Sequence, residues 1–171
     1  MWSDPPTYAG IGSRATSSRT TTTHTVRESG TNLSHGEKKK MKIEFFMPMI
    51  PPTITAQEHK VKIVNGKPVF YDPPELKQAK DKLIGHLVKY KPKRKYEGPV
   101  RLVVKWCFPL SGKHSNGEYK HTKPDTDNLQ KMLKDCMTKC GYWKDDALVA
   151  SEVVEKFWAE VPGIYICIEE I

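Results

Sequence analysis

The residues best suited to chemistry lie in one short polar segment and in an Asp-Asp pair that follows it. Asp125 and Asp127 are separated by one residue just before an expected helix, and Asp145-Asp146 follows the end of that helix. Alternate side chains of an extended chain point the same way, so Asp125 and Asp127 can share a cation. Carboxylate ligands without a paired His or Cys favour Mg²⁺, with Mn²⁺ as a substitute, over Zn²⁺.

Carboxylates that gather closely repel one another unless a proton or a hard cation lies between them. On a basic protein, such a cluster indicates phosphodiester hydrolysis, in which metal ions activate water and neutralise charge on the phosphate. Lys131 lies four residues after Asp127, one turn along the same helix face, where it can meet a phosphate. The spacing alone does not establish that Asp146 returns to the side of Asp125.

Ordinary structural roles also account for these residues. An Asp before a helix commonly caps it, which is the alternative for Asp127, and an Asp-Asp pair before a strand is often a solvated turn. Lys131, Lys134 and Lys139 can form the solvated face of the helix. The residue pattern by itself leaves these alternatives open.

Composition narrows the class of protein. The chain has 171 residues with 28 Lys+Arg against 20 Asp+Glu, a net charge of +8 that favours a polyanionic partner, nucleic acid ahead of an anionic membrane. No apolar run approaches the roughly 18 residues of a membrane span, and no secretory signal is recognisable, so an intracellular protein is expected. Four cysteines, at 107, 136, 140 and 167, lack zinc-ligand spacing and are expected to be buried thiols.

Residues 1–40 differ in composition from the rest. They hold 14 Ser or Thr and no apolar periodicity, so a disordered tail is expected. Residues 41–171 keep 22 basic and 17 acidic residues, a net charge of +5. The Gly-Glu-Lys run before Met41 can be encoded by codons resembling a ribosome-binding site, so we hypothesise that Met41 is the true start.

From Met41 onward, hydrophobic periodicity predicts the elements that must position the polar residues. The expected order is strand 42–47, hairpin strands 61–64 and 67–71, helix 73–90, a largely buried strand 100–108, a polar loop 111–123, helix 128–140, and strands 147–157 and 163–169. Asn65-Gly66 suits a two-residue hairpin turn. Asp72 is expected to cap the first helix and Gly141 to end the second. The Met and Cys stripe of the second helix is expected to be core.

The stretch KPDTDNLQKMLKDCMTKCGYWKDDALV resembles the signature of the RusA family of Holliday-junction resolvases. The shared features are Asp-x-Asp-Asn opening a helix, Lys four residues after the second Asp, Gly and aromatic residues after the helix, and Asp-Asp before a strand. This close resemblance covers about 27 residues. The rest of 41–171 is similar more loosely, in length, element order and an early proline-rich turn.

The resemblance implies an α+β fold with a small mixed sheet and two helices packed on it, in a homodimer. Members of this family, often encoded by phages and prophages, are endonucleases that use Mg²⁺ to make paired nicks across a four-way DNA junction. The resemblance therefore implies this activity for the chain, in the cytoplasm of a bacterial or phage-infected cell. Asp125, Asp127 and Asp146 match the metal-binding catalytic aspartates, and Lys131 matches the catalytic lysine. Asp145 ranks below Asp146 as a ligand.

Contacts with DNA are expected from His121, Lys123, Lys131 and Lys134. Some family members have arginines before the first Asp, where this chain has Lys123-Pro124. Two alternatives are a non-catalytic module that binds branched or single-stranded DNA, and a nuclease of the same fold that acts on forks or flaps. Cleavage of a panel of DNA substrates with and without Mg²⁺ separates all three.

Overall fold

The computed structural model describes residues 40–55 and 60–171, so the expected tail and the hypothesis of a start at Met41 lie largely outside the described residues. A four-stranded sheet forms the centre of the described part, in the order β1 (Lys42–Pro48), β6 (Gly163–Glu170), β4 (Val100–Pro109) and β5 (Val149–Ala159). β4 and β5 are parallel, whereas β1–β6 and β6–β4 are antiparallel. The expected mixed sheet is confirmed.

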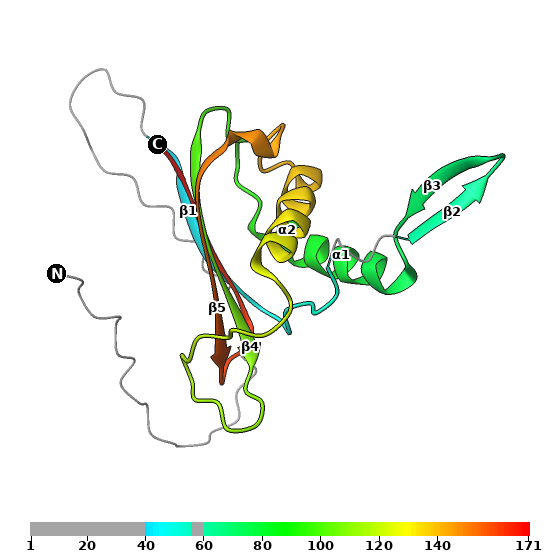
Figure 1. Cartoon of the computed structure of the whole chain (residues 1–171). Helices are drawn as coiled ribbons and strands as arrows, with labels where there is room; N and C mark the ends of the chain where they lie inside the picture. The colour runs from blue at the N-terminus through cyan, green and yellow to red at the C-terminus, as the bar shows by residue number, and fades with distance from the viewer. Residues whose placement is uncertain (1–39, 56–59) are drawn as a thin grey trace, which may run out of the picture.

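Two helices, α1 (Pro74–Leu87) and α2 (Thr126–Cys140), lie on the same side of the sheet (Figure 1). α2 connects the parallel strands β4 and β5, and such a connection must cross the sheet, which places a helix over its face. A separate hairpin of β2 (Lys60–Val64) and β3 (Lys67–Tyr71) precedes α1. The helices and strands follow the predicted order, and two short 3₁₀ turns that the sequence did not predict, η2 (Val88–Tyr90) and η3 (Asp146–Leu148), are added to it.

The core lies between the helices and one face of the sheet. Alternate residues of β1, β6 and β4 are aligned by the strand register and point to that face. They form three buried rows: Ile43, Ile168 and Leu102; Phe45, Ile166 and Val104; Met47, Ile164 and Trp106. The intervening residues of β4 are exposed or half-buried, so this strand is fully buried on one face only and less buried than the sequence predicts.

α2 buries the predicted apolar stripe. Its buried hydrophobic residues are Leu129, Met132, Leu133, Cys136, Met137 and Cys140. Gly141 ends the helix as predicted, with a left-handed φ of 79°. All four cysteines are free thiols, but Cys107 and Cys167 are half-buried rather than buried. The stripe is therefore core packing, which leaves the polar face of α2 for other roles.

The starts of α1, α2 and β5 differ from the sequence predictions. Pro73, not Asp72, occupies the N-cap position of α1, and Asp72 instead pairs with Lys80 at 2.6 Å, because a longer-range ion pair competes with capping. α2 begins two residues earlier than predicted, at Thr126. β5 covers Val149–Ala159 because η3 occupies the first residues of the expected strand.

No helix in the described ranges is long and apolar enough to cross a membrane.

The turn after α2 predicts a measurable effect on stability. Gly141→Ala should lower the free energy of unfolding by about 1 kcal/mol, because an L side chain is disfavoured at a left-handed φ. Gly85→Ala is the matched control: it lies in α1, and an added Cβ meets nothing within 4 Å. That substitution should stabilise the protein by about 0.5–1 kcal/mol in urea titrations. Equal effects of both substitutions on the free energy of unfolding would contradict a left-handed conformation at Gly141.

Candidate active site

The polar loop after β4 runs back along the free edge of β5 before it enters α2. The backbone nitrogen of Trp158 donates to the carbonyl of Glu118 at 2.8 Å, and that of Lys120 donates to the carbonyl of Lys156 at 2.9 Å. Tyr119 forms an isolated bridge with Phe157. The loop thus covers this part of the β5 edge and delivers the chain to the amino end of α2.

Lys156 of β5 clamps the last residues of this loop. Its ammonium group donates to the carbonyl oxygens of Thr122 at 2.9 Å and Pro124 at 2.6 Å. The Pro124 carbonyl belongs to the peptide bond of Asp125, so the clamp fixes the chain directly before the first candidate ligand. No sequence signal identified Lys156, because its role depends on contacts more than 30 positions away.

Lys120 anchors the same loop from the interior. It is 7% exposed, its ammonium group lies 4.4 Å from the centre of the Trp158 ring, and it donates to the Thr122 hydroxyl. Burial, with a smaller contribution from Lys156, lowers the pKa of Lys120. The sequence predicts only that Lys120 lies in a polar loop, whereas the structure shows a buried cation beside the rings of Phe108 and Trp158.

The amino end of α2 presents Asp125 and Asp127 to solvent. Asp125 occupies the N-cap position but its side chain makes no capping hydrogen bond, and Asp127 lies in the first helical turn. Lys131 is also exposed, one turn further along. Within the described part of the chain, none of these three side chains forms a hydrogen bond or ion pair. The capping alternative therefore does not account for Asp127, and a helix amino end favours negative charge.

The segment after α2 is fixed by buried aromatic residues. Tyr142 donates its hydroxyl to the carbonyl of Leu87 at 2.9 Å, and Trp143 donates its indole N–H to the Thr138 hydroxyl at 2.8 Å. Both aromatic side chains are essentially inaccessible to solvent. They hold the chain immediately before the Asp-Asp pair.

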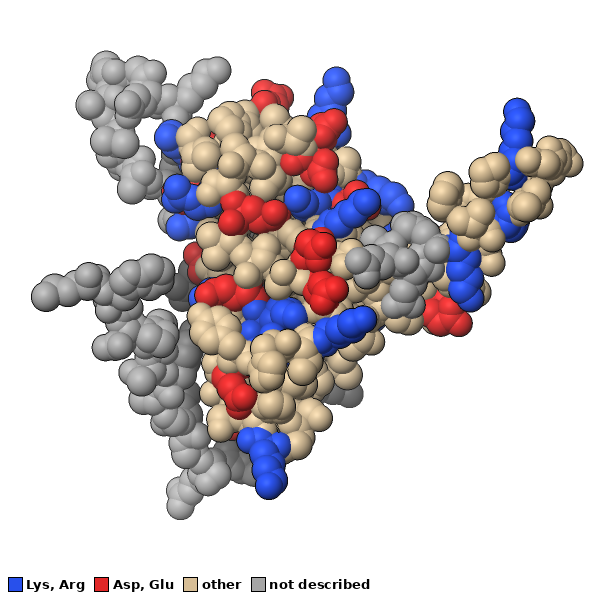
Figure 2. All heavy atoms as spheres, in the orientation of Figure 1, with Lys and Arg blue, Asp and Glu red and all other residues tan. Residues whose placement is uncertain are grey.

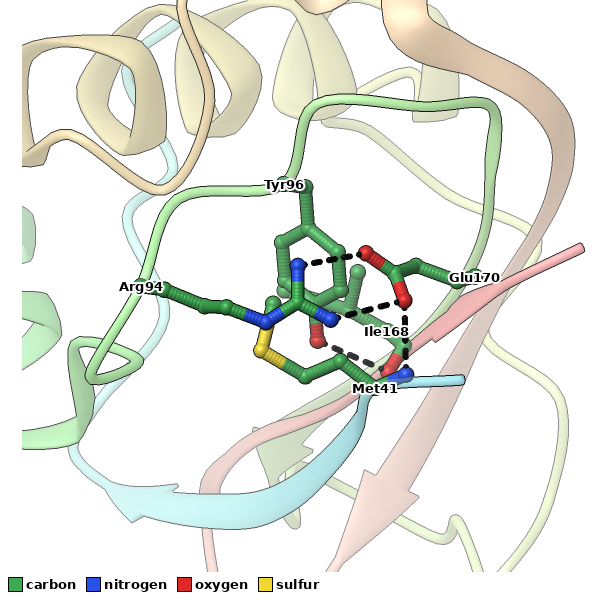
Figure 3. A network of polar contacts seen from close by, with 5 residues as sticks. All are labelled: Met41, Arg94, Tyr96, Ile168 and Glu170. Carbon is green, nitrogen blue, oxygen red and sulfur yellow. Dashed lines mark hydrogen bonds and ion pairs between the residues drawn. The ribbon is translucent and has the colours of Figure 1, made fainter. Parts of the chain in front are cut away.

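A second network supports these aromatic residues from the end of the sheet (Figure 3). Arg94 forms two 3.1 Å hydrogen bonds with the Glu170 carboxylate, which also accepts from the backbone nitrogen of Met41 at 2.7 Å. Tyr96 donates its hydroxyl to the carbonyl of Ile168 at 3.1 Å, and burial raises its pKa. Tyr96 also donates its backbone N–H to Tyr142, so the network reaches the segment before Asp145.

The two members of the Asp-Asp pair have different environments. The Asp145 carboxylate accepts a 2.8 Å hydrogen bond from the backbone of Ala147 and caps η3. Asp145 therefore has the turn role that the structural alternative describes. Asp146 begins η3 and is half-buried, with no hydrogen bond from its side chain to the described residues.

Asp146 is not gathered with Asp125 and Asp127 in this structure. Asp146 lies at a hollow of about 310 Å³ beside the later turns of α2. The residues that line this hollow are Asp135, Thr138, Lys139, Lys144, Asp145 and Asp146. The 13 residue steps from Asp127 to Cys140 span about 20 Å of helix. Residues 40–55 and 60–171 contain no group of three or more His, Cys, Asp or Glu arranged to hold a metal ion. The ligand roles of the three aspartates stay predictions.

The candidate DNA contacts differ in how available they are. His121, Lys123 and Lys131 are exposed, whereas Lys134 is half-buried and lies 3.4 Å from Glu152. Acidic and basic side chains are interspersed over the face shown in Figure 2. A partly exposed ion pair such as Lys134–Glu152 contributes about 1 kcal/mol, so a phosphate can compete for Lys134.

Comparison with known proteins decides the family. Residues 48–169 match the family Endodeoxyribonuclease RusA. The chain belongs to the RusA family. RusA proteins are hydrolases of DNA, and the resemblance found in the Asp-x-Asp-Asn segment is confirmed.

Two similar proteins extend this match. The chain is 34% identical over 133 residues to the crossover junction endodeoxyribonuclease rusA of Lactococcus phage r1t, an alignment that covers 77% of this chain and 100% of the relative. It is 32% identical over 120 residues to the protein YqaN of Bacillus subtilis strain 168, covering 64% of this chain and 84% of YqaN.

The Lys156 clamp predicts a local effect on backbone dynamics. Lys156→Met should speed hydrogen exchange of backbone amides between residues 120 and 127, because two carbonyl contacts that hold this segment are lost. Lys105→Met is the control, since Lys105 lies on the neighbouring strand and pairs 3.5 Å from Glu155. Unchanged exchange in Lys156→Met, or an equal increase in the control, would refute the clamp.

Proposed function

We propose that this chain resolves four-way DNA junctions by Mg²⁺-dependent paired cleavage and acts as a homodimer. The observation that carries the proposal is the match to the whole length of a phage crossover junction endodeoxyribonuclease. The exposed Asp125, Asp127 and Lys131 at one helix end are consistent with it. The substrate is DNA inside a bacterial or phage-infected cell, so we place the activity in the cytoplasm.

The donor chemistry of the three aspartates suits Mg²⁺, with Mn²⁺ as a substitute, because these hard cations prefer carboxylate oxygens. Asp125 and Asp127 are both exposed and lie at the amino end of α2, whereas Asp146 lies in the hollow near the other end of this helix. The proposal therefore requires an Asp146 side chain, from the same copy or from the second copy of the proposed homodimer, to join Asp125 and Asp127 when metal binds. The bound ion would activate water and neutralise charge on the phosphate.

The amino end of α2 suits a phosphate. Backbone N–H groups of the first helical turn have no partner within the helix and point toward an approaching anion. Lys131, exposed one turn along from Asp127, provides an ammonium group that stabilises negative charge developing on the scissile phosphate. His121, Lys123 and Lys134 would contact neighbouring phosphates and orient the DNA without reading its bases.

Dimerisation explains why the nicks would be paired. A two-fold dimer presents two identical sites, and a four-way junction has two equivalent strands at matching positions. Each site then cleaves one of these strands. Recognition rests on junction shape rather than on base contacts alone.

The test is a cleavage panel of four-way junction, fork, flap and linear duplex, each with and without Mg²⁺. Paired nicks in the junction that require Mg²⁺ support the proposal. Preferred cleavage of forks or flaps would make the chain a nuclease for other replication structures. Junction binding without any cleavage would favour a non-catalytic DNA-binding module.

Asp127→Asn should abolish junction cleavage in Mg²⁺ while junction binding persists, because the loss of one negative charge does not weaken attraction to DNA. Asp81→Asn, an exposed change on α1, is the control and should leave cleavage unchanged. Mn²⁺ affinity, followed by electron paramagnetic resonance, should fall in Asp125→Asn, Asp127→Asn and Asp146→Asn. Retained cleavage in Asp127→Asn, or an unaltered Mn²⁺ affinity in Asp146→Asn, would refute the respective assignment.

Binding should weaken steeply as salt rises, because each phosphate contact releases counterions. The slope of log affinity against log salt changes by about 0.9 for each contact, so Lys123→Ala should flatten it by about 0.9 per protomer. Fluorescence anisotropy with a labelled junction measures both slopes. If the affinity of the unaltered protein does not change with salt concentration, the proposed contacts between its basic residues and DNA phosphates are wrong.

A further inference from the structure

The β2–β3 hairpin extends away from the body of the protein (Figure 1). Every residue of both strands is exposed. An isolated two-stranded hairpin is marginally stable in water, because it buries little apolar surface of its own. The candidate active site does not use this element, so the apolar side chains that it exposes need another explanation.

The strand register separates the hairpin into two different faces. The basic face carries all three lysines of the hairpin, and its members are Lys60, Lys62, Val64, Lys67, Val69 and Tyr71. The apolar face carries Val61, Ile63, Pro68 and Phe70. Ile63 is 78% exposed and Phe70 is 71% exposed. The most exposed apolar side chains of the hairpin therefore lie on the face opposite the lysines.

The base of the hairpin is fixed to the body. Asp72, the residue after β3, pairs with Lys80 of α1 at 2.6 Å. At the other end, Asn65 with φ 51° and Gly66 with φ 77° make a tight turn. Strands of five residues extend about 17 Å, and the DNA major groove, about 12 Å wide, admits a two-stranded ribbon. The hairpin has the size and anchorage of an arm that reaches into DNA.

We propose that this hairpin is an arm that recognises the DNA branch point, with Ile63 and Phe70 packing on base faces exposed there and the three lysines binding flanking phosphates. This inference rests on the proposed function. Charge complementarity favours DNA as the occupant, because residues 60–71 hold three lysines and no Asp or Glu. Apolar and aromatic side chains contact base faces in many DNA complexes.

The physical advantage of such an arm is selectivity for branched DNA. In a continuous duplex, an apolar side chain must unstack two base pairs before it can contact their faces. At a branch point the stacking is already interrupted, so the same contact requires less unstacking. The apolar face should therefore favour junction over duplex, whereas the lysines should strengthen binding to both.

The test measures binding of the full chain to a four-way junction and to a linear duplex of the same sequence, without divalent ions. The double variant Ile63→Ala/Phe70→Ala should lower junction affinity about tenfold and leave duplex affinity and the salt slope nearly unchanged. Val64→Ala/Val69→Ala, on the opposite face, is the matched control and should keep the junction preference. All these side chains are exposed, and thermal melting checks that each variant folds.

The lysines give an independent measurement. The triple variant Lys60→Ala/Lys62→Ala/Lys67→Ala should weaken binding to junction and duplex alike, and should flatten the salt slope by nearly 3 per protomer. An unchanged slope would overturn the phosphate contacts. 2-Aminopurine placed at the branch point should report a fluorescence change on binding that is lost in Ile63→Ala/Phe70→Ala.

The outcomes separate this inference from the proposed function. Unaltered protein that binds junction and duplex equally would overturn both. A junction preference that survives in Ile63→Ala/Phe70→Ala would overturn the arm and leave the proposed function intact. A dimer that dissociates in that variant, seen by sedimentation velocity, with equal losses on both DNAs, would show that the apolar face binds a second copy of the chain instead.

Discussion

Burial of one face of α2 is the constraint on which the rest of the site depends. Its apolar stripe packs between the sheet and α1, where Leu129, Met132 and Leu133 are fully buried. Once that face is fixed, helical periodicity leaves Asp127 and Lys131 exposed on the polar face. The same packing directs the chain through Gly141 into the turn that starts β5. The position of the polar residues is thus a consequence of hydrophobic burial.

Hydrogen-bond networks hold the two ends of α2. At the amino end, Lys156 binds carbonyl groups of the incoming loop. At the carboxyl end, Tyr142 and Trp143 are hydrogen-bonded within the core, and Tyr96 links them to the end of the sheet. Both networks use buried or half-buried polar groups with satisfied partners, which favours one arrangement over its alternatives. The result is a helix held at both ends, with exposed carboxylates at Asp125, Asp127 and Asp145.

Membership of the RusA family and the geometry of the chain contribute different parts of the functional conclusion. The family establishes a DNA endonuclease. The structure shows which of the signature residues are free to act within its described ranges and which one, Asp145, caps a turn. It also shows that Asp146 lies apart from Asp125 and Asp127 within the described part of the chain. The projecting hairpin adds a second surface, with its own charge pattern, to the proposed contact with branched DNA.

The sequence by itself determined the order of elements, the hairpin turn at Asn65-Gly66, the end of α2 at Gly141 and the signature of the family. These features depend on local φ preferences and on periodicity, which neighbouring residues specify. Only the tertiary structure decided the strand order β1-β6-β4-β5, the clamp by Lys156 and the place of Asp146. It also replaced the predicted Asp72 cap with a pair to Lys80. Each of these depends on groups that come into contact only after the chain has folded, so patterns among neighbouring residues cannot predict them.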